Sequence, residues 1–192
     1  MNYIKNRLMF WKIGARKGLV TLVFIDLRNI GQMTEDVSPI ELFSFLKHYG
    51  FLVEKVLQSF NGHLVTQEGD CILSAFFDHS NDKGMDCCNY YFASEKIVES
   101  IMEDKILLSF FHTNKPVVVV SMCQGQCVYK VHGKRILGPF GSAVSTVEGL
   151  NGKISTKSSV IITDRSMANT CKDFTYEQVE SDLFIVSRLA RK

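Results

Sequence analysis

Residues 19–27 read LVTLVFIDL, a nearly continuous apolar run that contains a single acid, Asp26. Such a run, rich in β-branched residues, is typical of a central strand buried on both faces of a sheet. Asn29 and Gly31 follow directly and indicate a turn. Because a carboxylate near the end of a buried strand costs free energy unless something pairs with it, we expect Asp26 to have a partner.

A helix is predicted next along the chain. Ser38 suits the N-cap, Pro39 suits the first helical position, and Glu41 completes a capping box. Apolar residues then recur at intervals of three and four, which predicts one buried helical face. They are Leu42, Phe45, Leu46, Tyr49, Val53, Val56, Leu57 and Phe60. Asn61-Gly62 ends the pattern, so the helix is expected to stop there.

Two strand-like runs follow, His63 to Gln67 and Cys71 to Phe77, joined by a tight connection that contains Asp70. The remaining predicted elements are a helix from Cys87 to about Met102, a strand from Val117 to Met122 with Val128 to Val131 as a possible pairing partner, a short helix from Ala143 to Leu150, and strands from Val160 to Thr163 and from Leu183 to Leu189. The order indicates one α+β domain whose sheet is covered by two main helices.

Length and composition agree with one soluble domain. The chain has 192 residues, of which 46% are hydrophobic and 22% charged, and its formal net charge is +2. This balance lacks the basic excess of a nucleic-acid-binding protein. No apolar run approaches the ~20 residues that span a bilayer, and the N-terminus lacks the features of a signal peptide. We therefore expect a cytoplasmic location.

Residues 1–18 form a basic N-terminal extension to a domain that covers residues 19–192. The extension holds five basic residues and no acid, with Ile4, Leu8 and Trp11 at helical spacing. A basic amphipathic helix at a membrane surface is one interpretation. A connecting segment that packs on the domain is the interpretation we prefer.

The six cysteines are predicted to be ordinary thiols in a reducing compartment. Cys71, Cys123 and Cys127 lie in apolar segments, where a free cysteine behaves as a small hydrophobic residue. Cys123 and Cys127 are four positions apart and have no histidine close by at ligand spacing, which disfavours a zinc site.

Asp26 and Asp70 are the acids that could carry chemistry. In a β-α-β-β arrangement the first strand lies beside the later hairpin, so the two carboxylates can face each other. Two adjacent carboxylates repel, and a divalent cation removes that cost. Mg²⁺ suits this position because it needs few protein carboxylates and completes its shell with water and phosphates. Spacing alone leaves open that both acids are turn formers.

Three adjoining segments resemble the class III nucleotidyl cyclase domains, the adenylate and guanylate cyclases. VTLVFIDLRNIGQMTE (Val20 to Glu35) is similar to the family's strand of the type F-x-D-[IL]-R-G-F-T, SPIELFSFLKHY to its first helix, and NGHLVTQEGDCILSAFF to its G-D hairpin. A later segment, LGPFGSAVSTVEGL, is similar to Y-T-V-I-G-D-A-V-N-L-A-A-R-L. The resemblance implies a ferredoxin-like βαββαβ core, with an antiparallel-rich sheet and helices on one face.

The resemblance also implies a two-metal site for Mg²⁺ or Mn²⁺, with Asp26 and Asp70 as ligands and the Leu27 carbonyl assisting. ATP or another nucleoside triphosphate would lie beside the turn. The implied nucleotide-binding positions are Arg28, Asn29, Ile30, Gly31, Thr66, Gly69 and Gly138. Asn29 and Ile30 stand where the family has the Gly and Phe of its turn.

Other departures concern catalysis. Thr66 replaces the Lys or Glu that reads the base, and Gly138 falls on the second base-reading position. Ser145 replaces the Asn that orients the ribose, and Gly149 replaces the Arg that stabilises the transition state. An arginine in such a role contributes ~10³ to 10⁵ in rate in other phosphoryl-transfer enzymes. The resemblance therefore implies that the family's catalytic residues are not retained.

Family sites form between two subunits, so a homodimer, or a heterodimer with a second cyclase-type domain, is expected. The favoured interpretation is a degenerate domain that binds nucleotide and metal with little or no activity alone. The alternative is an active adenylate cyclase, either divergent or as the metal-donating half of a heterodimer. A third hypothesis is an α+β domain with no nucleotide function, in which Asp26 and Asp70 are structural.

Overall fold

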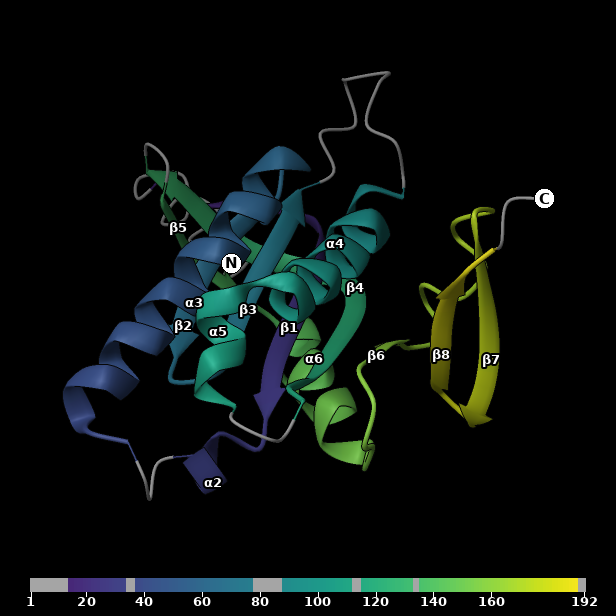
Figure 1. Ribbon diagram of the computed structural model, residues 1–192. Helices are drawn as coiled ribbons and strands as arrows, with labels where there is room; N and C mark the ends of the chain where they lie inside the picture. The colour runs from purple at the N-terminus through teal and green to yellow at the C-terminus, as the bar shows by residue number, and fades with distance from the viewer. Residues whose placement is uncertain (1–13, 34–36, 78–87, 112–114, 133–134, 190–192) are drawn as a thin grey trace, which may run out of the picture.

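The computed structural model describes residues 14–33, 37–77, 88–111, 115–132 and 135–189. Its described strands form one eight-stranded sheet in the order β2-β3-β1-β4-β6-β8-β7, with β5 paired to β4. All neighbouring strands are antiparallel except β4 and β6. The elements in chain order are β1 (Arg16–Arg28), α2 (Ile30–Met33), α3 (Pro39–Ser59), β2 (His63–Glu68), β3 (Cys71–Phe77), α4 (Asn89–Glu103), α5 (Lys105–Phe110), β4 (Val117–His132), β5 (Arg135–Phe140), α6 (Ser142–Lys153), β6 (Val160–Thr163), β7 (Phe174–Glu180) and β8 (Leu183–Arg188). The predicted α+β class is confirmed (Figure 1).

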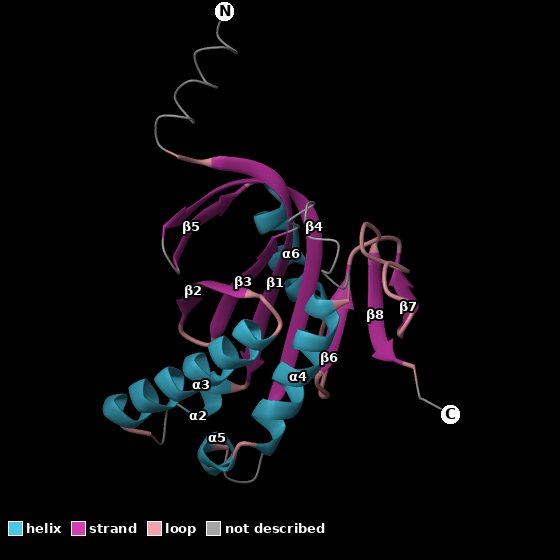
Figure 2. Cartoon of the chain, turned by 90° about the horizontal axis from the view of Figure 1, so that it is seen from above, coloured by secondary structure: helices cyan, strands magenta, loops and turns pink. Residues whose placement is uncertain are grey.

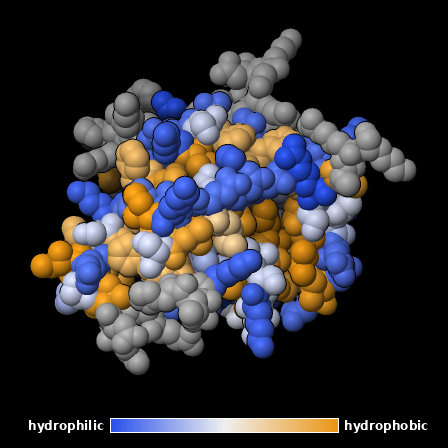
Figure 3. Space-filling model, in the orientation of Figure 1, coloured by the Kyte–Doolittle hydropathy of each residue, from blue (hydrophilic) through white to orange (hydrophobic). Residues whose placement is uncertain are grey.

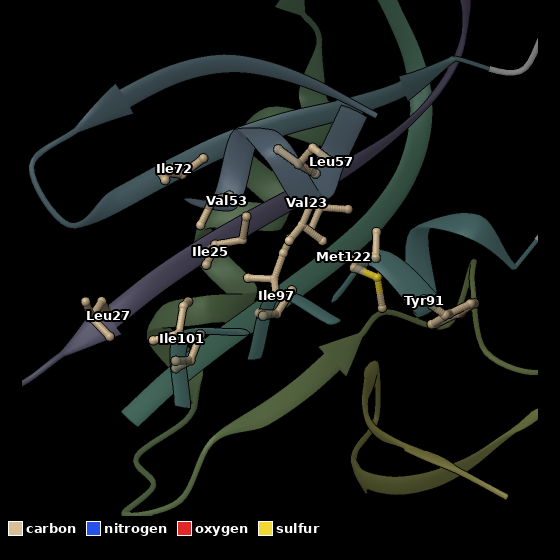
Figure 4. Close-up of a cluster of buried hydrophobic side chains, with 14 of the residues drawn as sticks. Val23, Ile25, Leu27, Val53, Leu57, Ile72, Tyr91, Ile97, Ile101 and Met122 are labelled. Atoms are coloured by element: carbon tan, nitrogen blue, oxygen red, sulfur yellow. The ribbon is translucent and has the colours of Figure 1, made fainter. Parts of the chain in front are cut away.

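The central strand β1 has apolar side chains on both faces. Val23, Ile25 and Leu27 point toward α3 and α4 (Figure 4), whereas Val20 and Leu22 pack in a second cluster with α6. The two helices of the predicted βαββαβ core, α3 and α4, lie on one face as predicted, and α6, which follows the core, covers the opposite face (Figure 2). The reason is that a strand buried on both faces needs cover on both.

The capping box at the start of α3 is present as predicted. The backbone N–H of Glu41 donates to Ser38 Oγ at 3.3 Å, and the backbone N–H of Ser38 donates to Glu41 Oε2 at 3.0 Å. These bonds satisfy two donors that a helix start otherwise leaves unpaired. The predicted buried stripe faces the sheet, while Ile40, Phe43 and Phe51 are exposed. Apolar side chains are visible over this helix in Figure 3.

Several predicted elements need correction. Val117 to Met122 and Val128 to Val131 belong to one continuous strand, β4. Within this strand Gly125 lies under α6, where an added Cβ would be 2.8 Å from the Cβ of Ala143. The strands β5 and β7 and the helices α2 and α5 were not predicted. The strand β7 lies at the sheet edge, and its burial pattern is mostly exposed, so its apolar signal is weak.

Two of the six cysteines are joined, which contradicts the prediction of free thiols. Cys88 and Cys171 form a disulfide across a sequence separation of 83 residues. Cys71, Cys123 and Cys127 are free, as predicted. Nothing in the local spacing of Cys88 and Cys171 signals the bond, because only the packing of α4 near the β6–β7 connection brings them together.

The structure bears on the N-terminal extension only in part. Residues 1–13, which carry the predicted amphipathic pattern, lie outside the described residues. The first strand begins at Arg16, three positions before the apolar run. Among the described residues, no helix is both long and apolar enough to cross a bilayer.

Candidate metal and nucleotide site

The last residues of β1 and the β2–β3 turn bring the two predicted acids together. Asp26 lies directly opposite Cys71 in the antiparallel pairing of β1 with β3, so their side chains share one face of the sheet. Asp70 immediately precedes Cys71, in a two-residue turn whose Gly69 has φ 62°. One ligand atom from each of Asp26, Asp70 and Cys71 lies within 4.8 Å of the others. The proximity of the two carboxylates is therefore as predicted.

Cys71 was missed as a member of this cluster. Its Sγ lies 3.7 Å from Asp26 Oδ1 and 3.8 Å from Asp70 Oδ1. Burial, together with the two neighbouring carboxylates, raises the pKa of the Cys71 thiol to about 12. The signal that could have identified it is its place beside Asp70 in a hairpin that pairs with β1.

Arg28 is the partner that Asp26 was expected to need. The two residues are two positions apart on one strand and therefore point to the same face. Arg28 Nε lies 2.9 Å from Asp26 Oδ2. Burial raises the pKa of Asp26 above its ordinary value of 3.8, Arg28 opposes this, and the Asp70 carboxylate adds to it. The site therefore holds two mutually repelling acids, a condition that a bound cation relieves.

Arg28 also connects this site to α6. Its Nη2 donates to the backbone carbonyl of Asn151 at 2.9 Å and to Asn151 Oδ1 at 2.6 Å. The Asn151 side chain is buried and donates in turn to the carbonyl of Val119 on β4 at 3.3 Å. Arg28 was predicted as a nucleotide-binding residue, and here it holds the end of β1 to α6.

The other predicted nucleotide-binding positions lie on different elements. Asn29, with φ 71°, is exposed in the turn after β1, and α2 follows with Ile30 buried and Gly31 exposed. Thr66 is exposed on β2, and Gly138 is half-buried on β5, a strand that contacts β2. Leu27 is fully buried in β1.

Ser145 and Gly149 lie one turn apart on the exposed side of α6. They line a cavity of about 420 Å³ together with Thr146, Leu150, Lys153, Asp164, Arg165, Ser166 and Asp182. The described residues that line it include neither Asp26 nor Asp70. The metal-type cluster and these two positions are thus separate within one chain.

Solved structures with a similar fold include nucleotidyl cyclase domains. A non-canonical dimeric guanylyl cyclase domain from the fungus Blastocladiella emersonii superimposes with a TM-score of 0.74 at 16% identity, covering 93% of this chain and 98% of that one. The adenylyl cyclase CyaB from P. aeruginosa gives 0.73 at 16% identity, covering 93% and 97%. This chain has the class III nucleotidyl cyclase fold.

Further comparisons agree with the cyclase fold. The guanylate cyclase domain of RhGC from Catenaria anguillulae, solved in complex with GTP, gives a TM-score of 0.69 at 16% identity, covering 92% of this chain and all (100%) of that one. In sequence, an adenylate cyclase of Anabaena cylindrica is 33% identical over 63 residues, which are 33% of this chain and 12% of that protein. No protein-family model matches the chain.

Proposed function

We propose that this chain is a cyclase-like signalling domain that binds a divalent metal ion and a nucleoside triphosphate, with little or no cyclase activity alone. The observation that carries the proposal is the meeting of Asp26, Asp70 and Cys71 within 4.8 Å at the end of β1. On the exposed side of α6, Ser145 and Gly149 stand at the positions where the family resemblance places the ribose-orienting Asn and the transition-state Arg.

The residues at the end of β1 fit a hard divalent cation. Asp26 Oδ1 and the Asp70 carboxylate are oxygen donors of the kind that Mg²⁺ and Mn²⁺ use, and the raised pKa of Asp26 reflects burial beside another acid. When bound, such ions activate an attacking hydroxyl and neutralise a polyphosphate leaving group. The turn after β1 would place backbone N–H groups beside the phosphates.

We expect the isolated chain to have little cyclase activity because of two residues of α6, Ser145 and Gly149. In a homodimer, each site would receive the metal ligands of one subunit and the Ser145 and Gly149 positions of the other. Glycine has no side chain that could stabilise charge on a transferring phosphate. A loss of ~10³-fold or more in rate is expected from the absence of an arginine in that role.

The alternative is an active adenylate cyclase that converts ATP to cyclic AMP and pyrophosphate, either divergent or as the metal-donating half of a heterodimer. The sequence match to an adenylate cyclase over 63 residues favours it. In a heterodimer the partner would supply the Asn and the Arg. The two proposals differ in activity and agree on the role of Asp26 and Asp70.

Thermal unfolding with Mn²⁺ and ATP or GTP tests the shared part. Ligand at 100 times its Kd stabilises a protein by about 2.7 kcal/mol. For a chain of this size each kcal/mol shifts the Tm by roughly 2–4 °C, so we expect a rise of roughly 5–11 °C. Asp70→Asn, in a half-exposed turn, should abolish the rise, and the exposed Asp173→Asn is the matched control. An equal rise in Asp70→Asn would refute the proposed site.

Cyclic nucleotide production separates the two proposals. The degenerate domain predicts binding without product by the purified chain. The alternative predicts cyclic nucleotide from this chain alone, or from this chain mixed with a second cyclase-type chain. In either case the product should be lost in Asp26→Ala.

A further inference from the structure

The sulfur of Cys71 lies between the two acids of the site. Opposite residues on antiparallel strands share a face, which places Cys71 beside Asp26, and the turn places Asp70 on its other side. The distances from Sγ to the two Oδ1 atoms, 3.7 and 3.8 Å, are nearly equal. The cluster therefore offers two oxygens and one sulfur toward a common centre.

Arg28 limits what Asp26 can do for a metal. Its Nε occupies Asp26 Oδ2 at 2.9 Å, and its Nη2 is held by Asn151. Oδ1, which lies 3.7 Å from Cys71 Sγ, is therefore the Asp26 oxygen that faces the cluster. The donors that remain are Asp26 Oδ1, the Asp70 carboxylate and Cys71 Sγ, a set that suits one ion.

The spacing of these donors matches a tetrahedral ion with mixed ligands. Zinc bonds of ~2.3 Å to sulfur and ~2.1 Å to oxygen place the two donors about 3.6 Å apart at a tetrahedral angle. The observed separations are 3.7 and 3.8 Å. Charge is also balanced, because two carboxylates, one thiolate, the Arg28 guanidinium and a divalent ion sum to zero.

A buried hydroxyl on α3 lies within electrostatic reach of the cluster. Tyr49 on α3 is fully buried, and its hydroxyl has no hydrogen-bond partner among the described residues. Burial raises its pKa, and the charges of Asp26, Cys71 and Asp70 raise it further, so it lies within the field of these groups. Buried hydroxyls in folded proteins normally have a partner.

We propose that Asp26, Asp70 and Cys71 bind one thiophilic divalent ion, of the zinc, cobalt or cadmium class, with Cys71 as a thiolate ligand. The thiol releases its proton to the buffer when the ion binds. This inference rests on the metal site of the proposed function and deepens it. A thiophilic ion occupies the carboxylates that Mg²⁺ or Mn²⁺ needs, so zinc excludes the ions on which nucleotide binding depends.

The test is a Co²⁺ titration of the full chain without thiol reductant. Binding is monitored by the sulfur-to-cobalt charge-transfer absorption in the near ultraviolet. The affinity for Zn²⁺ is then measured by its displacement of Co²⁺. Cys71→Ser removes the sulfur and keeps the size of the side chain. Cys127→Ser, at a buried free cysteine on β4, is the matched control. We expect the band in the wild type and in Cys127→Ser, and no band in Cys71→Ser. Loss of a supporting residue of a metal site costs 10–100-fold in affinity, so loss of this ligand should weaken Zn²⁺ binding by about 100-fold.

The outcomes separate this inference from the proposed function. A band that persists in Cys71→Ser, or unchanged Zn²⁺ affinity there, overturns the role of Cys71. Retention of Mn²⁺-nucleotide stabilisation in that variant would then leave the proposed function intact. A cobalt band without any Mn²⁺-nucleotide stabilisation supports the thiophilic site and refutes the proposed function. Asp70→Asn, which keeps the thiol, should also weaken Zn²⁺ binding, and its melting curve shows whether the variant is folded.

Discussion

Asn151, near the end of α6, holds Arg28 in place beside Asp26, and its removal should loosen the end of β1. Asn151→Ala removes the acceptor of a 2.6 Å bond from the guanidinium and the donor to the Val119 carbonyl. A hydrogen bond to a charged group is worth about 1.5–3 kcal/mol and a neutral one about 0.5–1.5 kcal/mol. Because 35% of the Arg28 side chain is exposed, the lower part of the first range applies. We expect a loss of about 2–3 kcal/mol, or roughly 4–12 °C in Tm.

A double-mutant cycle that combines Asn151→Ala with Arg28→Met isolates the contact between these two side chains. The free energy of unfolding of each variant is measured by circular dichroism. The reasoning requires that the double variant lose at least ~0.5 kcal/mol less than the sum of the single variants, since residues in contact couple by 0.5–3 kcal/mol. The bond from Arg28 to the Asn151 backbone carbonyl persists in Asn151→Ala, so the coupling reports the side-chain bond. Additivity within ~0.3 kcal/mol would refute the reasoning.

Three further predictions concern stability. Ser38→Ala removes the N-cap acceptor of α3 and should lower the free energy of unfolding by about 1 kcal/mol, whereas Ser38→Thr should keep most of the cap's stabilisation. Equal melting curves for Ser38→Ala and the wild type would contradict this. Reduction of Cys88–Cys171, which closes a loop of 83 residues, should remove on the order of 4 kcal/mol, and Cys171→Ser should melt at the same temperature with and without reductant. The raised pKa of Asp26 means that the folded state binds its proton more tightly than the unfolded state, so this contribution is fully present below pH 3.8 and is lost as the pH rises through the raised folded pKa. Unfolding free energies measured against pH without metal should show this component in the wild type and not in Asp26→Asn.

The local parts of the fold were predictable from the sequence. The apolar run that ends in Asp26, the Ser38–Glu41 capping box and the hairpin that carries Asp70 all depend on neighbours within a few residues. Their observed bounds differ from the predicted ones by only a few residues. The approach of Asp26 to Asp70 was also predictable, because a β-α-β-β order places the first strand beside the hairpin.

Contacts between distant segments could not be predicted in this way. The Arg28–Asn151 bond joins residues 123 positions apart, and the disulfide joins residues separated by 83. Neither pair carries a local pattern, since each depends on how α6 or α4 docks on the sheet. The same holds for Cys71, whose sequence context is that of a small apolar residue in a strand. Sequence alone determined the strands and helices and the two acids that meet, because periodicity and capping are local. Only the tertiary structure decided that a sulfur lies between those acids and that an arginine holds one of them, because these contacts depend on strand register and helix packing.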